Sequence, residues 1–500
     1  MNLRVAPPCG GAQVGGFAPH TPQDIFEQMK EDIVLLDRSA SDLARMIAAR
    51  EIKPSEVMEA HLARSASVNG AVNAIVSPRA PEVLMDEARA ADDAPGRGWL
   101  HGLPLAVKDL VAVKGLRTTY GSPIFADHVP GADDLVAARM RAAGAILVGK
   151  TNTPEWGHGS HSFNPVFGVT RNPYDLTRTA GGSSGGAAAA LAARLVPLAD
   201  GSDMMGSLRN PAAFCNVYGM RPSYGRVPGD ALGDTFMATL ATEGPMARTV
   251  EDVARFLGVL AGENPTVPFG LPGGDFLRPP DDLKGRRIGW LGDWGGAYPC
   301  EPGILDLCRA GLAVLADQGA EIDEVAPPFP AEKLWWAWLT LRAFLNAGAK
   351  GAMRDDPAQW AQLKPETQWE IEQGLAVTAA EVHAASVIRS RWYARAAKLF
   401  ARYDALVMPS AQVWPFPADW RWPRAINGRA MDTYHRWMEV VVPVSLIGLP
   451  SLAVPCGFGA EGLPMGMQII GRFGADAEVL AIGQSYHAAT DWPGRRPPAL

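Results

Sequence analysis

Two serines in separate glycine-rich turns, Ser183 and Ser207, constrain this chain more than any other feature of its sequence. In GGSSGG, four glycines surround Ser183 and Ser184, and a run of alanines follows. Glycine allows backbone N–H groups to turn toward a reacting atom, and the alanine run predicts a helix whose N-terminus opens on this turn. In DMMGS, Ser207 follows Gly206, and residues 209–211 are expected to end the turn. The pattern indicates serine hydroxyls placed where negative charge is stabilised.

A lysine, Lys108, interrupts the apolar run at residues 103–113, which is typical of a buried strand. The chain has only ten lysines against 36 arginines. Desolvation disfavours the ammonium form, so a buried lysine can be neutral enough to accept a proton. The alternative is an ion pair with the adjacent Asp109, although neighbouring residues of a strand point to opposite faces.

The whole stretch from residue 179 to residue 227 resembles the signature of the amidase signature family of serine hydrolases. The resemblance extends upstream to HGLPLAVKDL, which contains Lys108, and to GKTNTPEWG. Downstream it includes GPMARTVEDVA and the C-terminal segments LIGLPSLAVPCGF and LPMGMQIIG. Matching segments run from about residue 42 to residue 482, and the weakest similarity lies between about residues 265 and 402. The resemblance implies a catalytic triad of Lys108, Ser183 and Ser207.

The mechanism implied by this resemblance is a proton relay. Neutral Lys108 takes a proton from Ser183, Ser183 takes one from Ser207, and Ser207 attacks the amide carbonyl. The backbone N–H groups of residues 204–207 then stabilise the oxyanion, and water hydrolyses the acyl-enzyme. Members of this family also have a cis peptide bond before the residue equivalent to Ser183. The proposed oxyanion donors are therefore Met204, Met205, Gly206 and Ser207.

The sequence departs from the family pattern at Met205, where two glycines usually precede the nucleophile. The backbone N–H survives this change. We expect the larger side chain to project from the oxyanion loop and to alter the loop or reshape the substrate pocket.

Two other motifs suggest different chemistry. Residues 144–151, GAILVGKT, fit the phosphate-binding pattern in which Lys150 would bind phosphate and Thr151 magnesium. Residues 145–148 are typical of a strand, however, and Pro154 follows closely, whereas a phosphate loop leads into a helix. The turn around Ser184 also fits G-x-S-x-G, which would require a downstream acid and histidine.

The histidines available for such a triad are His383, His435 and His487, and none stands in a turn after an apolar strand. This alternative also leaves Lys108 unexplained. His158 and His161 lie in a glycine-rich loop without a supporting ligand at a useful interval, so no metal and no cofactor is expected.

Composition favours a large enzyme that acts on small molecules. The chain is 47% hydrophobic and 20% charged, and its net charge of −7 predicts no binding to nucleic acid or to an anionic membrane. Prolines in the uncharged stretch at residues 440–459 favour two buried strands over a membrane helix. The five cysteines lack C-x-x-C spacing and indicate reduced thiols in a cytoplasmic protein. A homodimer is left open.

Apolar strands at residues 103–113, 145–148, 405–408 and 452–454 alternate with amphipathic helices such as residues 41–50 and 56–66. This alternation predicts an α/β layered fold. The family resemblance implies a single large α/β/α domain around a mixed β-sheet, over residues 31–490, with a helical segment at about residues 331–401 that covers the site. The first 30 residues, rich in glycine and proline, are expected to form a flexible arm.

Tryptophans indicate the substrate class, because ten of the fifteen lie between Trp335 and Trp437. Trp414, Trp420 and Trp422 lie among prolines, outside any regular element, and are the predicted substrate pocket. They favour an apolar or aromatic amide, anilide or carbamate. The alternatives are the glutaminase subunit of a tRNA-dependent amidotransferase, which uses the same triad, and a non-catalytic scaffold subunit.

Overall fold

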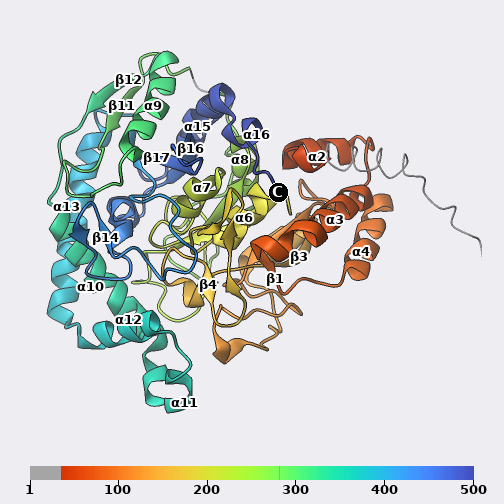
Figure 1. The fold of residues 1–500 in the computed structure, drawn as a ribbon, viewed down its shortest axis with the longest axis horizontal. Coiled ribbons are helices and arrows are strands. Elements are labelled where there is room, and N and C mark those ends of the chain that lie inside the picture. Colours follow the sequence, from red (N-terminus) through yellow and green to blue (C-terminus); the bar gives the residue numbers. More distant parts are fainter. Residues whose placement is uncertain (1–34, 281) are drawn as a thin grey trace, which may run out of the picture.

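A sheet of eleven strands forms the centre of the computed structural model, which describes residues 35–280 and 282–500 (Figure 1). Its strand order is β1-β3-β2-β8-β10-β9-β16-β17-β13-β11-β12. The strands are β1 Ile75–Val76, β2 Pro104–Lys108, β3 Ile146–Thr151, β8 Leu198–Asp203, β9 Tyr218–Arg221, β10 Thr242–Ala247, β11 Arg287–Trp290, β12 Glu321–Glu324, β13 Ala405–Pro409, β16 Ser451–Phe458 and β17 Pro464–Ile470. Three small hairpins pair β4 Phe163–Asn164 with β5 Gly168–Val169, β6 Arg171–Asn172 with β7 Asp175–Thr179, and β14 Ala425–Ile426 with β15 Arg429–Ala430. The predicted arm at residues 1–30 lies outside the described residues.

Both faces of the sheet are buried, and the side chains show it. Successive residues of a strand point to opposite faces. One hydrophobic cluster contains Ala106, Ala199, Met246 and Ala453, and a second contains their neighbours Val107, Leu198, Ala247 and Leu452. The alanines of α6 join the first cluster and the apolar side chains of α8 join the second, so helices cover both faces. The predicted layered α/β fold with a mixed sheet is confirmed.

The α-helices are α2 Ala40–Ala48, α3 Pro54–Val72, α4 Pro81–Asp93, α5 Leu135–Ala142, α6 Gly185–Ala192, α7 Arg209–Cys215, α8 Val250–Leu260, α9 Ile304–Asp317, α10 Ala331–Lys350, α11 Pro357–Trp360, α12 Pro365–Ala376, α13 Ala379–Phe400, α14 Val442–Leu446, α15 Asp476–Thr490 and α16 Trp492–Arg495. Short 3₁₀ turns are η1 Pro123–Phe125, η2 Glu155–Gly157, η3 Gly351–Asp355 and η4 Arg436–Val441. Figure 1 shows α10 to α13 on the side of the molecule opposite α3 and α4. Residues 331–400 are thus mainly helical. Among the described helices, none combines the length and the apolar character needed to cross a membrane.

Strand direction brings the site together at one edge of the sheet. β2 runs parallel to β3 on one side and to β8 on the other, and β10 pairs with β8 in the antiparallel direction. Because the carboxyl ends of parallel strands meet at the same edge, Lys108 at the end of β2 lies near the end of β8.

Several predicted boundaries are wrong. The strand expected over residues 103–113 ends at Lys108, since the chain turns at residues 109 and 110 to follow the edge of the sheet. Residues 440–459 contain one strand, β16, because η4 and α14 occupy the first half, where two strands were expected. Residues 209–211, expected to end a turn, are instead the first residues of α7.

Candidate active site

Lys108 lies at the centre of the site, with its side chain fully buried at the end of β2. Its Nζ lies 2.8 Å from each of three hydroxyl oxygens, those of Ser183, Ser184 and Ser202. Ser183 and Ser184 come from the GGSSGG turn, and Ser202 comes from β8. The amine is therefore surrounded by groups that can both donate and accept a proton.

Burial lowers the pKa of Lys108 to about 8, while the nearby carboxylates of Glu243, Asp200 and Asp203 oppose this shift. The backbone N–H of Lys108 donates to Asp200 Oδ1 at 2.7 Å, which fixes the end of β2 against β8. Lys108 therefore becomes neutral at a lower pH than an exposed lysine does.

Hydrogen bonds with Ser160 and Ser162 fix the GGSSGG turn in place. The Ser160 hydroxyl donates to the Gly182 carbonyl, and the Gly185 amide donates to the Ser162 hydroxyl at 3.1 Å. The peptide bond between Gly182 and Ser183 is cis. A Cβ at Gly186 would lie 2.2 Å from the backbone nitrogen of residue 152, so only glycine fits where α6 passes that segment. The helix predicted after the turn is α6.

Asp203, at the end of β8, shapes the second turn. Its carboxylate accepts the Gly206 amide at 2.9 Å and the Leu208 amide at 3.2 Å. Burial opposes ionisation of this carboxyl, but the guanidinium groups of Arg209 and Arg221 outweigh burial and lower the pKa of Asp203. The turn is therefore organised by a permanent buried anion.

Three of the four predicted oxyanion donors have free N–H groups. The amides of Met204, Met205 and Ser207 donate to no group among the described residues. The amide of Gly206 is committed to Asp203, which removes it from the set of donors. At φ +78°, Gly206 adopts the left-handed conformation that lets the turn close.

Met205 does not project from the loop as expected. Its side chain is 2% exposed and packs in the main hydrophobic cluster, because the turn directs it behind the loop. The neighbouring Met204 is the partly exposed side chain, and its Sδ lies 3.3 Å from Arg342 Nη1. The change from glycine at position 205 therefore alters the packing behind the loop.

The two glycine-rich turns are in direct contact, since the Ser184 amide donates to the Ser207 carbonyl. Ser207 is 7% exposed and Ser183 is 2% exposed. The structure therefore brings Lys108, both serines and the free amides into one buried site.

The motif at residues 144–151 does not form a phosphate loop. Gly149, Lys150 and Thr151 continue β3, and the ammonium of Lys150 donates to the Val111 carbonyl. Lys150 also lies near Asp109, whose carboxylate accepts the Thr119 amide at 3.1 Å. Asp109 is thus engaged away from Lys108, in line with their expected opposite orientation.

The geometry does not support a role for His487 or His435 in a serine–histidine–acid triad, or for His158 in a metal site. His487 contacts the Tyr218 hydroxyl at 2.9 Å, and His435 is buried with no hydrogen-bond partner among the described residues. His158 contacts Thr367 and Asn346, each at 3.1 Å. The hydroxyl of Ser184 meets only Lys108 and Ser202 among the described side chains and backbone groups.

His161 lies 2.7 Å from the Thr179 hydroxyl and 3.1 Å from the Ala418 carbonyl, so it supports the segment that leads into the GGSSGG turn. No group of three or more His, Cys, Asp or Glu side chains in the described part of the chain could hold a metal ion. The four described cysteines are free thiols, and Cys9 lies outside the described residues.

The three predicted pocket tryptophans separate into two cavities. Trp414 and Trp420 line a cavity of about 800 Å³ together with Phe416 and Phe458, and none of the proposed triad residues lines it. Trp422 lines a small cavity of about 10 Å³ beside Ser160, the residue that binds the Gly182 carbonyl. Of the three, only Trp422 therefore lines a cavity next to the GGSSGG turn, and the three tryptophans do not share one cavity.

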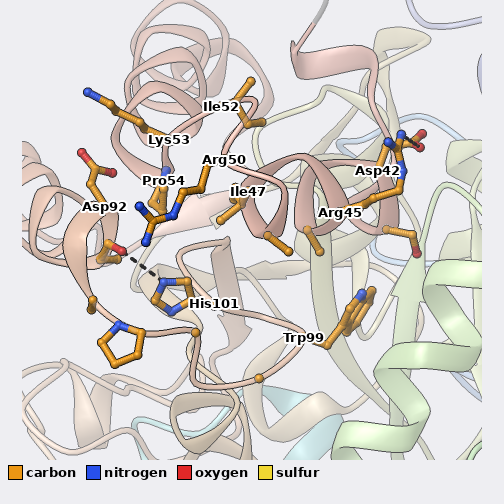
Figure 2. Close-up of a pocket in the computed structure, with 18 of the residues that line it drawn as sticks. Asp42, Arg45, Ile47, Arg50, Ile52, Lys53, Pro54, Asp92, Trp99 and His101 are labelled. Carbon is orange, nitrogen blue, oxygen red and sulfur yellow. Dashed lines mark hydrogen bonds and ion pairs between the residues drawn. The ribbon is translucent and has the colours of Figure 1, made fainter.

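A further cavity, of about 870 Å³, lies between α2, the start of α3 and the end of α4 (Figure 2). Figure 2 shows charged groups of both signs around it, among them Asp42, Arg45, Arg50 and Asp92. None of the proposed catalytic residues lines this cavity.

A buried ion pair beside the turn at residues 203–207 was not predicted from the sequence. Arg342 on α10 donates to Glu370 on α12 at 2.6 Å and to the Tyr434 hydroxyl at 2.8 Å. Asn346 joins this network through Glu370. The signal was visible, because Arg342 interrupts an apolar helical run much as Lys108 interrupts an apolar strand.

Comparisons with known proteins agree with this geometry. A family model described as Amidase matches residues 56–480. An acylamidase from Rhodococcus erythropolis is 34% identical over 472 residues, covering 92% of this chain and 97% of that protein. One component of the glutamyl-tRNA(Gln) amidotransferase of Chloroflexus aggregans is also 34% identical, over 484 residues, covering 90% of this chain and 96% of that component.

Solved structures give the same result. A bacterial aryl acylamidase of the amidase signature enzymes superimposes with a TM-score of 0.85 at 30% identity, covering 92% of this chain and 99% of that one. A 6-aminohexanoate cyclic dimer hydrolase in complex with its substrate superimposes with a TM-score of 0.82 at 26% identity, with the same two coverages.

Proposed function

This chain belongs to the amidase family and is an amidase, and from this premise we propose that it hydrolyses small apolar or aromatic amides through an acyl-enzyme on Ser207. The observation that carries the proposal is the 2.8 Å contact between Lys108 Nζ and Ser183 Oγ, in a site where Ser207 stands beside free backbone amides.

Lys108 is the base of the proposed relay. A neutral amine has two N–H groups that donate and one lone pair that accepts. It can therefore form one hydrogen bond with each of its three neighbouring hydroxyl groups. In this arrangement Ser183 donates its proton to Nζ, while Nζ donates to Ser184 and Ser202. A serine hydroxyl attacks poorly at neutral pH unless its proton is removed, so Ser183 accepts the proton of Ser207 as Ser207 attacks the carbonyl.

The oxyanion of the tetrahedral intermediate is stabilised by the free amides of Met204, Met205 and Ser207. Each such donor typically contributes about a 100- to 1,000-fold increase in rate. Because Asp203 already holds the turn, these amides need no rearrangement when charge develops on the substrate. Lys108 then returns its proton to the leaving amine, and water hydrolyses the acyl-enzyme.

The aromatic side chains beside Ser160 support this substrate class; they are Phe163, Trp422, Tyr434 and Trp437. The space among them is about 10 Å³, the size of one water, so an aryl group can enter only if these side chains move apart. Aromatic faces bind apolar and aromatic groups well. The names of the relatives, an acylamidase and an aryl acylamidase, support an anilide or another aryl amide as substrate.

The charged side chains at this cavity already have hydrogen-bond partners. Arg421 forms two hydrogen bonds with Glu366, and the Lys364 ammonium donates to the His158 carbonyl at 2.5 Å. Glu366 therefore neutralises Arg421, whereas Lys364 is held by an uncharged carbonyl. A carbamate remains within the proposed class, since it presents the same carbonyl to Ser207.

The second candidate is a glutaminase subunit of a tRNA-dependent amidotransferase, which the match to proteins of that kind favours. Glutamine would require unpaired groups for its α-carboxylate and α-amino ends. The aromatic lining of the Trp422 cavity argues against this candidate, and the retained Lys108, Ser183 and Ser207 argue against a scaffold without activity.

The test combines labelling with a substrate panel. A serine-directed phosphonate is expected to modify Ser207, and an anilide is expected to have a higher kcat/KM than acetamide or glutamine. An adduct on another residue would refute the nucleophile, and a preference for glutamine would favour the amidotransferase candidate.

We also propose a cytoplasmic location, because the described cysteines, including the buried Cys215 and Cys308, are unpaired thiols. The homodimer stays a prediction, which sedimentation of the purified protein would test.

A further inference from the structure

Glu243 is an acidic side chain at the active site to which the relay assigns no role. It lies in β10, where its cross-strand partner in β8 is Ser202. Directly opposed residues of an antiparallel pair point to the same face, with Cβ atoms about 5 Å apart. Ser202 is itself a hydroxyl partner of Lys108. The register therefore directs the Glu243 carboxylate toward the same buried space as the Lys108 amine.

One carboxylate oxygen of Glu243, Oε2, is shielded from solvent and has no hydrogen-bond partner among the described residues. Glu243 as a whole is partly buried. Leaving a shielded carboxylate oxygen without a partner is costly, so this oxygen is available to a cation that forms nearby. Lys108 is the basic group that acts most strongly on Glu243.

Two of the other ionisable groups near Lys108, Asp203 and Lys150, are engaged elsewhere, whereas Asp200 is only partly engaged. Asp203 is paired with two arginines, and Asp200 accepts the backbone N–H of Lys108 through Oδ1. Lys150, which faces Asp200 from β3, donates to a backbone carbonyl. Asp200 Oδ2 has no partner in the described structure, so Asp200 is the one competing carboxylate.

Three ionisable side chains act on Glu243 electrostatically. They are Lys108 on β2, Asp200 on β8 and Asp134 at the start of α5. Asp134 accepts the Ala112 amide at 2.6 Å and so is held by the loop after β2. Glu243 is thus the carboxylate on β10 that completes the surroundings of Lys108.

We propose that Glu243 is the counter-ion of the ammonium that forms on Lys108 during catalysis. This inference rests on the proposed function. In the acylation step, the Ser207 proton passes to Ser183, the Ser183 proton passes to Lys108, and the amine becomes an ammonium. Glu243 stabilises that ammonium until its proton moves to the leaving amine, after which Lys108 is neutral again. Glu243 acts through Lys108 and is a positioning residue.

Each of the two groups shifts the pKa of the other. Burial raises the pKa of Glu243 to about 8 and lowers that of Lys108 to about 8, and each charge favours the ionised form of the other. Removing the carboxylate therefore lowers the proton affinity of Lys108. The neutral, active form then appears at lower pH, while the ammonium formed in the reaction loses its stabilising charge.

The experiment compares Glu243→Gln with the unaltered enzyme, using an anilide substrate from about pH 5.5 to 10. We expect the ascending limb of kcat/KM to move about one pH unit toward acid and the alkaline plateau of kcat to fall about tenfold. Glu243→Asp, which keeps the charge but retracts it, should give a smaller shift in the same direction. Glu321→Gln, on the exposed edge strand β12, is the matched control and should leave the profile unchanged.

If Glu243 had a purely structural role, its replacement would lower activity without moving the ascending limb of the kcat/KM profile. A folded Glu243→Gln variant whose ascending limb does not move therefore overturns the proposal. If Glu243→Gln does not fold, the ascending limb of Glu243→Asp decides in the same way. Ser207→Ala, measured alongside, separates the two hypotheses. Activity in Ser207→Ala refutes the proposed function, whereas an inactive Ser207→Ala with an unmoved limb in the Glu243 variants refutes only the counter-ion.

Discussion

The backbone amide of Ser184 donates to the carbonyl of Ser207 at 3.2 Å, so the two glycine-rich turns are joined by a direct hydrogen bond. This contact aligns the residue after Ser183 with the proposed nucleophile, although Ser183 and Ser207 lie 24 positions apart in the sequence. The relay therefore depends on the backbone of both turns as well as on three side chains.

Ser207→Ala is expected to lower kcat for an anilide by more than about 1,000-fold, because it removes the nucleophile and leaves the core unchanged. Ser184→Ala is the matched control. It removes one of the three hydroxyl partners of Lys108, so activity should fall but stay measurable. Mass spectrometry after phosphonate treatment should find the adduct on Ser207 in the Ser184 variant. Labelling of Ser184 in the unaltered enzyme would contradict this assignment.

Lys108→Arg tests whether Lys108 acts as a base or only as a positive charge. Arginine stays protonated throughout the accessible pH range, so it cannot accept the Ser183 proton. We expect a loss of more than about 1,000-fold in kcat at every pH, with folding checked by circular dichroism. Near-normal turnover in this variant would rule out the relay.

The pH profile of the unaltered enzyme should report the titration of Lys108. Burial lowers its pKa to about 8 from the usual value for lysine, and only the neutral amine accepts a proton. The kcat/KM for an anilide should therefore rise with pH and level off above about pH 9. A flat profile between about pH 6 and 10 would exclude Lys108 as the base.

Two tryptophans, Trp422 and Trp420, distinguish which cavity binds substrate. Trp422→Ala removes an aromatic wall beside Ser160, and we expect kcat/KM for an anilide to fall about tenfold, the effect of roughly 1.4 kcal/mol. Trp420→Ala changes only the separate cavity and should leave kcat/KM within about twofold. The reverse result would place the aromatic group of the substrate in the larger cavity.

Activity is expected to persist in EDTA and to need no ATP. The proposed base, nucleophile and oxyanion donors are all groups of this chain, and Lys150 is occupied inside β3. The measurement is anilide hydrolysis after chelation, with and without added nucleotide. ATP-dependent turnover that vanished in Lys150→Met would revive the phosphate-loop hypothesis.

The sequence predicted the parts of the site that depend on local chemistry. A lysine inside an apolar strand and a glycine-rich turn before an alanine run are both local patterns, and Lys108 and α6 lie as they indicate. The mixed sheet was implied by the family resemblance, since strand order depends on contacts between distant segments.

The pocket could not be predicted in the same way. Trp414 and Trp422 are close in sequence, yet Trp414 packs beside residues 302–303 and 459, whereas Trp422 packs near Tyr434. The direction of the Met205 side chain could not be predicted either, because it depends on the dihedral angles of the turn rather than on residue type.

Met205 connects the hydrophobic core to the back of the oxyanion turn. Truncating a buried methionine to alanine typically costs about 2–5 kcal/mol of stability, and here the vacated space would lie behind the backbone amides that are proposed to receive the charge. A substitution of Met205 is therefore expected to change both the stability of the fold and the position of the proposed oxyanion donors.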